Sequence, residues 1–115
     1  MPNLMPKDIA PLVAEVLRSA SQADGEHPYF LTAYQILDRL PDDIRTRLIQ
    51  ERTLGGSGAG VRYGAPSVVS DAAEMLPNIR IDYIDNRGIQ VQVAGQTITP
   101  GFEVCGIYRI EPDNS

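Results

Sequence analysis

The chain has 115 residues, a mass of 12.6 kDa, a formal net charge of −5 and a sequence pI near 4.7. This length is typical of one domain, and a hydrophobic fraction of 43% allows a core that needs no metal or disulfide. The acidic balance argues against a general nucleic-acid-binding protein, which is usually basic, although a specific one can still segregate its charges on one face.

Features that the sequence lacks indicate its cellular compartment. The chain opens with no basic and apolar leader, and no apolar run reaches the length of a membrane span. Cys105 is the single cysteine, so an internal disulfide cannot form. We therefore expect one soluble, cytoplasmic domain over residues 1–115, with loose tails at residues 1–6 and 111–115.

A first helix is predicted from Asp8, because apolar residues recur there at the three- and four-residue spacing of one buried stripe. The stripe consists of Ile9, Leu12, Val13, Val16, Leu17 and Ala20. The Gly, Pro and Asp content of residues 21–28 then indicates a loop. A short extended piece at residues 29–31 precedes the next helix.

The second helix carries the clearest local signal in the chain. Thr32 and Gln35 have the spacing of a capping box, in which the hydroxyl accepts from a backbone N–H and the longer side chain reaches back. Pro41 is expected to stop this helix. A third helix is predicted over Pro41–Arg52, and its thin apolar content indicates that it lies on the surface.

The stretch 53–64 is predicted to be a flexible loop, because four glycines in six residues cannot hold a regular element. Its G-x-G-x-G spacing does not match the dinucleotide-binding fingerprint, and its role stays open. Pro66 is expected at the first position of the last helix. That helix would bury Val69, Ala72, Ala73 and Leu76, and would present Ser67, Ser70, Asp71 and Glu74 on its opposite face.

The remainder of the chain is predicted to be β-structure. Apolar and polar residues alternate over Ile79–Tyr83 and over Ile89–Val93, and Asp85–Gly88 supplies turn chemistry for a hairpin between these two strands. Further turns at residues 94–95 and 100–101 separate a brief strand at 96–99 from a last strand at 103–110.

The sequence holds no constellation typical of catalysis or metal binding. His27 is the only histidine and Cys105 the only cysteine, whereas a zinc site needs several such ligands at short spacing. Cys105 lies in an apolar strand, where a thiol is usually packed and inert. No spacing selects a catalytic pair among Asp71, Glu74, Asp82 and Asp85. We therefore predict a protein that is not an enzyme, with no metal and no cofactor.

Arginine supplies all but one of the ten basic residues, the exception being Lys7. Its guanidinium suits bidentate contact with phosphates or carboxylates. Arg45 and Arg52 share a helix face, Arg62 comes just before the last helix, and Arg87 is expected at the hairpin tip. An equally strong interpretation is that these arginines form surface ion pairs with Asp42, Asp43, Glu51 and Asp82.

The order of helix, extended piece, capped helix, last helix and hairpin resembles the winged helix-turn-helix family. Leu31–Leu37 looks like that family's second helix, Ser67–Leu76 like its third, and Asn78–Val93 like its wing. The resemblance implies a winged-helix-like α+β fold with three to four helices and a small antiparallel sheet or hairpin. Two features depart from the pattern: Pro41–Tyr63 lengthens the connection between the second and third helices, and the third presents acids where a phosphate-lined groove favours bases.

Two functions follow as expectations. The first is a small DNA-binding transcriptional regulator, by analogy of fold, that contacts duplex DNA through Arg62, Tyr63, Ser67, Ser70, Arg87, Arg45 and Arg52. The second is an acidic protein-interaction module, an adaptor or inhibitor that binds a basic protein and no DNA. A homodimer is compatible with both. The sequence leaves open which partner is bound, its identity and the oligomeric state.

Overall fold

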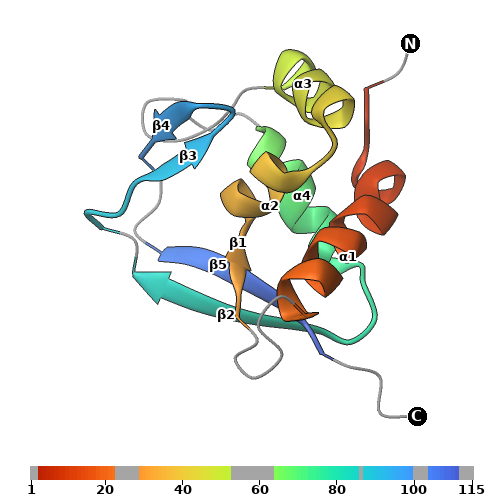
Figure 1. Cartoon of the computed structure of the whole chain (residues 1–115), viewed down its shortest axis with the longest axis vertical. Helices are drawn as coiled ribbons and strands as arrows, with labels where there is room; N and C mark the ends of the chain where they lie inside the picture. The colour runs from red at the N-terminus through yellow and green to blue at the C-terminus, as the bar shows by residue number, and fades with distance from the viewer. Residues whose placement is uncertain (1–2, 23–28, 53–63, 86, 100–103, 112–115) are drawn as a thin grey trace.

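The computed structural model describes residues 3–22, 29–52, 64–85, 87–99 and 104–111. Within these ranges the chain forms four helices and five strands, an α+β fold of the class predicted from the sequence (Figure 1). The elements are α1 (Pro6–Gln22), β1 (Leu31–Thr32), α2 (Ala33–Arg39), α3 (Asp42–Glu51), α4 (Ala65–Glu74), β2 (Ile79–Asp85), β3 (Val91–Val93), β4 (Gln96–Ile98) and β5 (Val104–Ile110).

The capping box predicted for α2 is confirmed. The Gln35 backbone N–H donates to Thr32 Oγ1 at 3.2 Å, and the Thr32 backbone N–H donates to Gln35 Oε1 at 2.8 Å. Both donors would otherwise lie unsatisfied at the start of a helix. Thr32 is itself buried, so this cap fixes the point at which β1 becomes α2.

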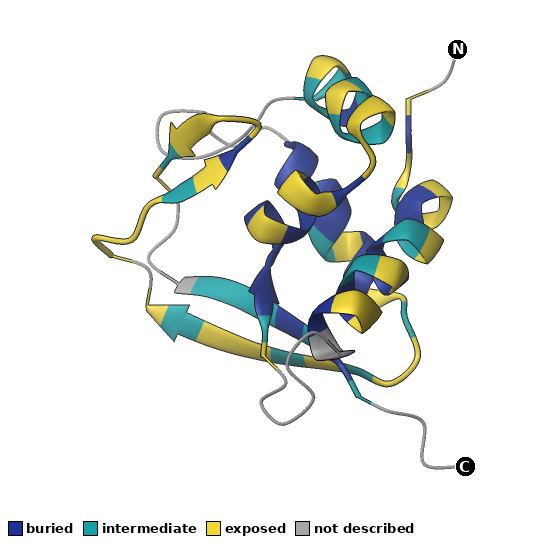
Figure 2. Cartoon of the chain, viewed as in Figure 1, coloured by how far each residue is buried: buried dark blue, intermediate teal, exposed yellow. Residues whose placement is uncertain are grey.

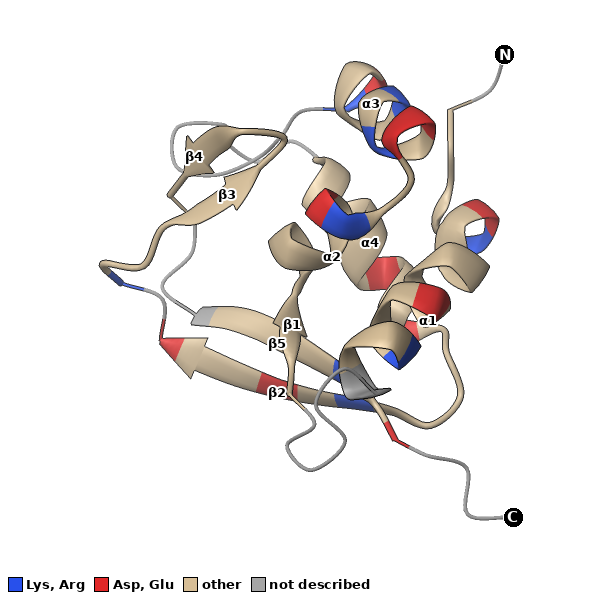
Figure 3. Cartoon of the chain, in the orientation of Figure 1, with Lys and Arg blue, Asp and Glu red and all other residues tan. Residues whose placement is uncertain are grey.

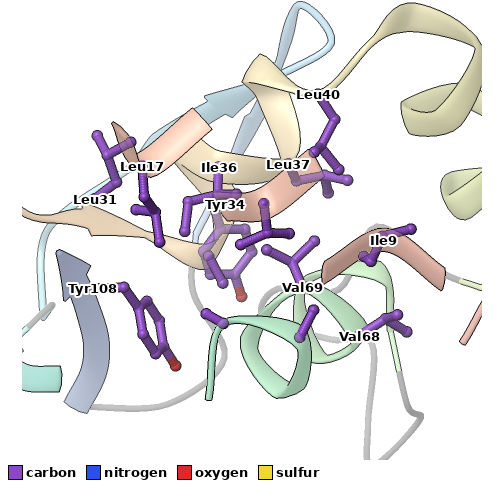
Figure 4. Packing of buried hydrophobic residues seen from close by; sticks show 14 of the residues in the cluster. Ile9, Leu17, Leu31, Tyr34, Ile36, Leu37, Leu40, Val68, Val69 and Tyr108 are labelled. Carbon is purple, nitrogen blue, oxygen red and sulfur yellow. The ribbon is translucent and has the colours of Figure 1, made fainter. Parts of the chain in front are cut away.

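The hydrophobic core lies between the helices and one face of the sheet. α1 and α2 both pack against α4, and the stripe predicted on α1 supplies Ile9, Val13 and Leu17 (Figures 2 and 4). Figure 4 shows Ile36 and Leu37 of α2 facing Val69 of α4, with Tyr108 of β5 at the edge of the cluster. α1, α2 and α4 therefore cover one face of the sheet with shared apolar side chains.

The predicted hairpin between residues 79–83 and 89–93 is wrong, because the strands pair differently. β2 pairs antiparallel with β5 along all seven of its residues, from Ile79 opposite Ile110 to Asp85 opposite Val104, whereas β3 pairs only with β4. The turn between β3 and β4 consists of Ala94 and Gly95, whose φ angles are 52° and 80°. Two successive positive φ angles form the tight turn that best matches the strand twist. Arg87 and Gly88 instead lie in the connection that leads from β2 to β3.

The strand order in the larger sheet is β1-β5-β2. The last strand of the chain therefore lies in the centre, with the short β1 on one side and β2 on the other (Figure 1). Taken with the order of the helices, this arrangement is compatible with the layout expected from the sequence. α3 lies outside that layout as an added helix between α2 and α4.

The segment before α1 is not a loose tail, as had been expected. Leu4 is only 8% exposed and belongs to the core cluster, and its backbone N–H donates to Glu51 Oε1 at 2.7 Å. α1 begins at Pro6 rather than Asp8. Of the predicted glycine-rich loop only Gly64 is described; it is buried and is the N-cap residue of α4. Residues 53–63 lie outside the described ranges.

Removing the Thr32 hydroxyl tests the capping box. The Thr32→Ala variant is expected to lower the free energy of unfolding by about 1 kcal/mol, the usual cost of losing such a cap, as measured by urea denaturation. Thr46→Ala, at an exposed position inside α3, is the matched control and should change stability less. Equal losses in the two variants would contradict a specific role for the cap.

Candidate nucleic-acid interface

The seven residues predicted to contact DNA fall on three parts of the structure. Arg45 lies within α3 and Arg52 caps its C-terminus, Ser67 and Ser70 lie on α4, and Arg87 follows β2. The remaining two, Arg62 and Tyr63, lie outside the described residues. The structure therefore shows the surroundings of five of these seven residues.

Arg45 is held at the junction of α2 and α3. Its Nη2 donates to Asp42 Oδ1 at 2.6 Å, and its Nη1 donates to the backbone carbonyl of Asp38 at 2.8 Å. The second bond satisfies a carbonyl in the last turn of α2, where helices have unpaired acceptors. Arg45 thus joins two consecutive helices, and its charge is largely balanced within the chain.

Arg52 attaches the N-terminal segment to the end of α3. Its Nη2 donates to the Leu4 carbonyl at 3.3 Å and lies 3.7 Å from the Met5 sulfur. The neighbouring Glu51 accepts the Leu4 N–H, and this hydrogen bond, followed by that from Arg47, lowers the pKa of Glu51. Both backbone groups of Leu4 are therefore held by the end of α3.

Arg87 is not at the tip of a hairpin formed by β2 and β3, as had been predicted. It follows β2 at the start of the connection to β3, where its Nη2 donates to Asp85 Oδ2 at 2.7 Å and its backbone N–H donates to Asp85 Oδ1 at 3.0 Å. These bonds lower the pKa of Asp85 and raise that of Arg87. Arg87 is therefore an exposed cation that is paired with Asp85, the last residue of β2.

On α4 the two serines differ in their surroundings. Ser67 is half-buried in the first turn, whereas the Ser70 hydroxyl is hydrogen-bonded to the Tyr108 hydroxyl of β5. The residues most exposed on this side of the helix are Asp71 and Glu74. α4 carries no Lys or Arg, and Figure 3 shows only acidic charge on its ribbon.

Tyr108 is the site residue that sequence reasoning missed. It is only 4% exposed, and burial raises the pKa of its phenol while the bond from Ser70 opposes that shift. A Cβ added at Gly106 would lie 2.8 Å from the Tyr108 hydroxyl, so the glycine leaves the space that the ring occupies. A glycine two residues before an aromatic residue on a strand is the one signal that could have indicated this contact.

The structure also describes the surroundings of other groups that the sequence singles out. They contain no group of three or more His, Cys, Asp or Glu residues that could hold a metal ion. The Cys105 thiol is half-buried and donates weakly to the Gly106 carbonyl at 3.5 Å, and His27 lies outside the described ranges. No helix in the described part of the chain combines the length and the apolar character that crossing a bilayer requires.

Comparisons of the chain with protein-family models, with curated proteins and with solved structures find no match.

The buried phenol of Tyr108 predicts a loss of stability at alkaline pH. Its pKa is raised above 10.0 in the folded chain, so the unfolded chain loses this proton first and stability falls as the pH rises through that range. Tyr108→Phe removes the hydrogen bond to Ser70, so its free energy of unfolding at neutral pH should be lower by about 1 kcal/mol. Its further loss of stability at alkaline pH should be smaller than that of the wild-type protein. Urea denaturation from neutral to alkaline pH measures both effects.

Ser70→Ala is the control for this pH dependence, because it removes the hydrogen bond and keeps the titrating group. It should lose stability at neutral pH and retain the full alkaline decrease. An alkaline decrease of the same size in Tyr108→Phe and in the wild-type protein would show that Tyr108 is not its source.

Proposed function

We propose that this protein is an acidic protein-interaction module that binds a partner with a basic surface, and that the exposed side of α4 is the contact surface. The observation that carries the proposal is the distribution of charge around α4. Asp71 and Glu74 are exposed on this helix, which carries no Lys or Arg. The arginines described near the predicted DNA surface bond to acceptors of their own chain.

The energetics favour a basic partner over a phosphate backbone. Contact between an arginine and a phosphate requires a cation free to replace condensed counterions. Arg45 and Arg87 already pair with carboxylates at 2.6 and 2.7 Å, so each adds little net positive charge to its surface, and Arg52 bonds to the N-terminal segment. Two exposed carboxylates on α4 would repel phosphates and attract Lys or Arg on a protein surface.

DNA binding is the second candidate, and one observation favours it. The order of α1, β1, α2, α4, β2 and β5, with the sheet order β1-β5-β2, is compatible with a winged helix-turn-helix layout. In such a regulator the contacts would come from Arg62, Tyr63, Ser67 and Arg87, since Ser70 is engaged by Tyr108. This support is by fold analogy. For both candidates we propose a cytoplasmic location and no enzymatic activity.

Charge reversal on α4 tests the first candidate. Wild-type protein immobilised and exposed to extract of its source cells is expected to retain a defined partner, and Asp71→Lys combined with Glu74→Lys should weaken retention on the order of tenfold or more by creating like-charge contact. Glu15→Lys combined with Asp43→Lys has the same change in charge on α1 and α3 and should retain the partner. Equal loss in both double variants would contradict a specific surface on α4.

A titration of a mixed-sequence DNA duplex separates the two candidates. The interaction module should cause no shift of the duplex at any salt concentration. Binding that weakens steeply with salt, and that Arg62→Glu combined with Arg87→Glu abolishes, would establish the DNA-binding regulator in its place.

A further inference from the structure

The outer side of β2 is an open strand edge. β2 is a border strand of its sheet, and among the described residues no strand pairs with it on the side away from β5. The Glu111 N–H donates to the Asn78 carbonyl at 2.8 Å, so the backbone polar groups of Asn78 face β5. Because these groups alternate along a strand, those of Arg80 and Asp82 also face β5, and those of Ile79, Ile81 and Tyr83 point outward.

A hydrogen bond at Tyr83 agrees with this alternation. The Tyr83 N–H donates to the carboxylate of the preceding residue, Asp82, at 3.1 Å, rather than to an acceptor on β5. The outward-pointing backbone N–H and C=O groups of β2 therefore bond to a local side chain or face solvent. Seven residues of open edge are long enough to template another strand.

The side chains along this edge alternate in charge and polarity. Ile81 lies opposite the buried Tyr108 on the helix side of the sheet, so Arg80 and Asp82 lie on the other face. Both are exposed. Arg80 is 3.8 Å from Glu111, and Asp82 forms no ion pair with the described residues. Tyr83, on the helix side, is 67% exposed, the largest value among the exposed large hydrophobic side chains of the described residues.

We propose that β2 binds β2 of a second copy of this chain in antiparallel register, with Ile81 opposite Ile81. The result is an isologous dimer with one continuous sheet through both protomers. In this register Arg80 lies opposite Asp82 of the partner, and Asp82 lies opposite the partner's Arg80. Ile79 lies opposite the partner's Tyr83, so each exposed ring covers an apolar neighbour.

The adjacent symmetric registers are unfavourable. A twofold axis at Asp82 would place the two Asp82 carboxylates opposite each other, and an axis at Arg80 would oppose two guanidinium groups; like charges directly opposite destabilise a strand pair. If one strand shifts by a single residue, each residue whose backbone N–H and C=O point outward lies opposite a residue whose groups point toward β5. Such a register cannot form the ladder of hydrogen bonds. The axis at Ile81 satisfies the backbone and both charge pairs.

Charges on an edge strand usually prevent association. Here the two charges are opposite in sign and two residues apart, so on symmetric pairing they attract. Formation of the ladder would take the Tyr83 N–H from the Asp82 carboxylate and free that carboxylate for the partner's Arg80. An interface confined to one strand edge is small, so the dimer is expected to be weak and dependent on concentration.

Sedimentation velocity over a range of protein concentrations tests the proposal, which does not depend on the proposed function. The wild-type protein should pass from monomer to dimer as its concentration rises. In a dimer of the Arg80→Asp variant, two acids lie opposite each other at both charge pairs, and in a dimer of Asp82→Arg two bases do. Each variant alone should therefore dimerise more weakly by on the order of tenfold or more. Circular dichroism confirms that each variant is folded.

A mixture of the two variants identifies the register. Asp at position 80 of one chain then lies opposite Arg at position 82 of the other, and the second pair is the original Asp82 with Arg80. The mixture should therefore form a heterodimer at concentrations where each variant alone dimerises only weakly. Arg18→Asp and Asp43→Arg, exposed on α1 and α3, carry the same charge changes and should dimerise as the wild type does. A wild type that stays monomeric, single variants that dimerise normally, or a mixture that stays monomeric would overturn the proposal.

Discussion

The fold depends on the central position of β5. This last strand pairs with β1 on one side and with all of β2 on the other, and its Tyr108 is bonded to Ser70 of α4. This one strand thus joins β1, from the first third of the chain, to α4 and β2. The same arrangement leaves β2 at the border of the sheet, so the open edge follows directly from the topology.

The second constraint is the local balance of charge. The chain is acidic, and several of its arginines bond to carboxylates two to four residues away, as Arg45 does to Asp42, Arg47 to Glu51 and Arg87 to Asp85. Exposed pairs of this kind contribute little to stability. They place the positive charge of these arginines beside acids of the same chain, which reduces the cationic character of the surface.

The sequence predicted what depends on near neighbours. The Thr32 capping box, the α1 stripe and the helix of residues 42–51 are set by residues within about two turns of one another, and all three are present. Contacts between distant residues were missed. The partner of β2 was assigned to the nearest alternating segment, although β5 offered a strand of equal length, and the burial of Leu4 depends on Glu51, 47 residues away.

The site was only partly predictable for the same reason. The exposed acids of α4 followed from helical periodicity, but the bond between Ser70 and Tyr108 joins residues 38 positions apart and has no local pattern. Arg87 was placed correctly after the first strand and wrongly at a hairpin tip, since its position depended on the misassigned strand pair.

Amide hydrogen exchange along β2 tests the topology and its open edge most directly. In dilute protein the amides of Arg80, Asp82 and Ile84, which face β5, should be protected, and those of Ile81 and Tyr83 should exchange rapidly. At high protein concentration the Ile81 and Tyr83 amides should gain protection as the second copy pairs with them. Equal protection along β2 at every concentration, or rapid exchange at Asp82, would contradict this account.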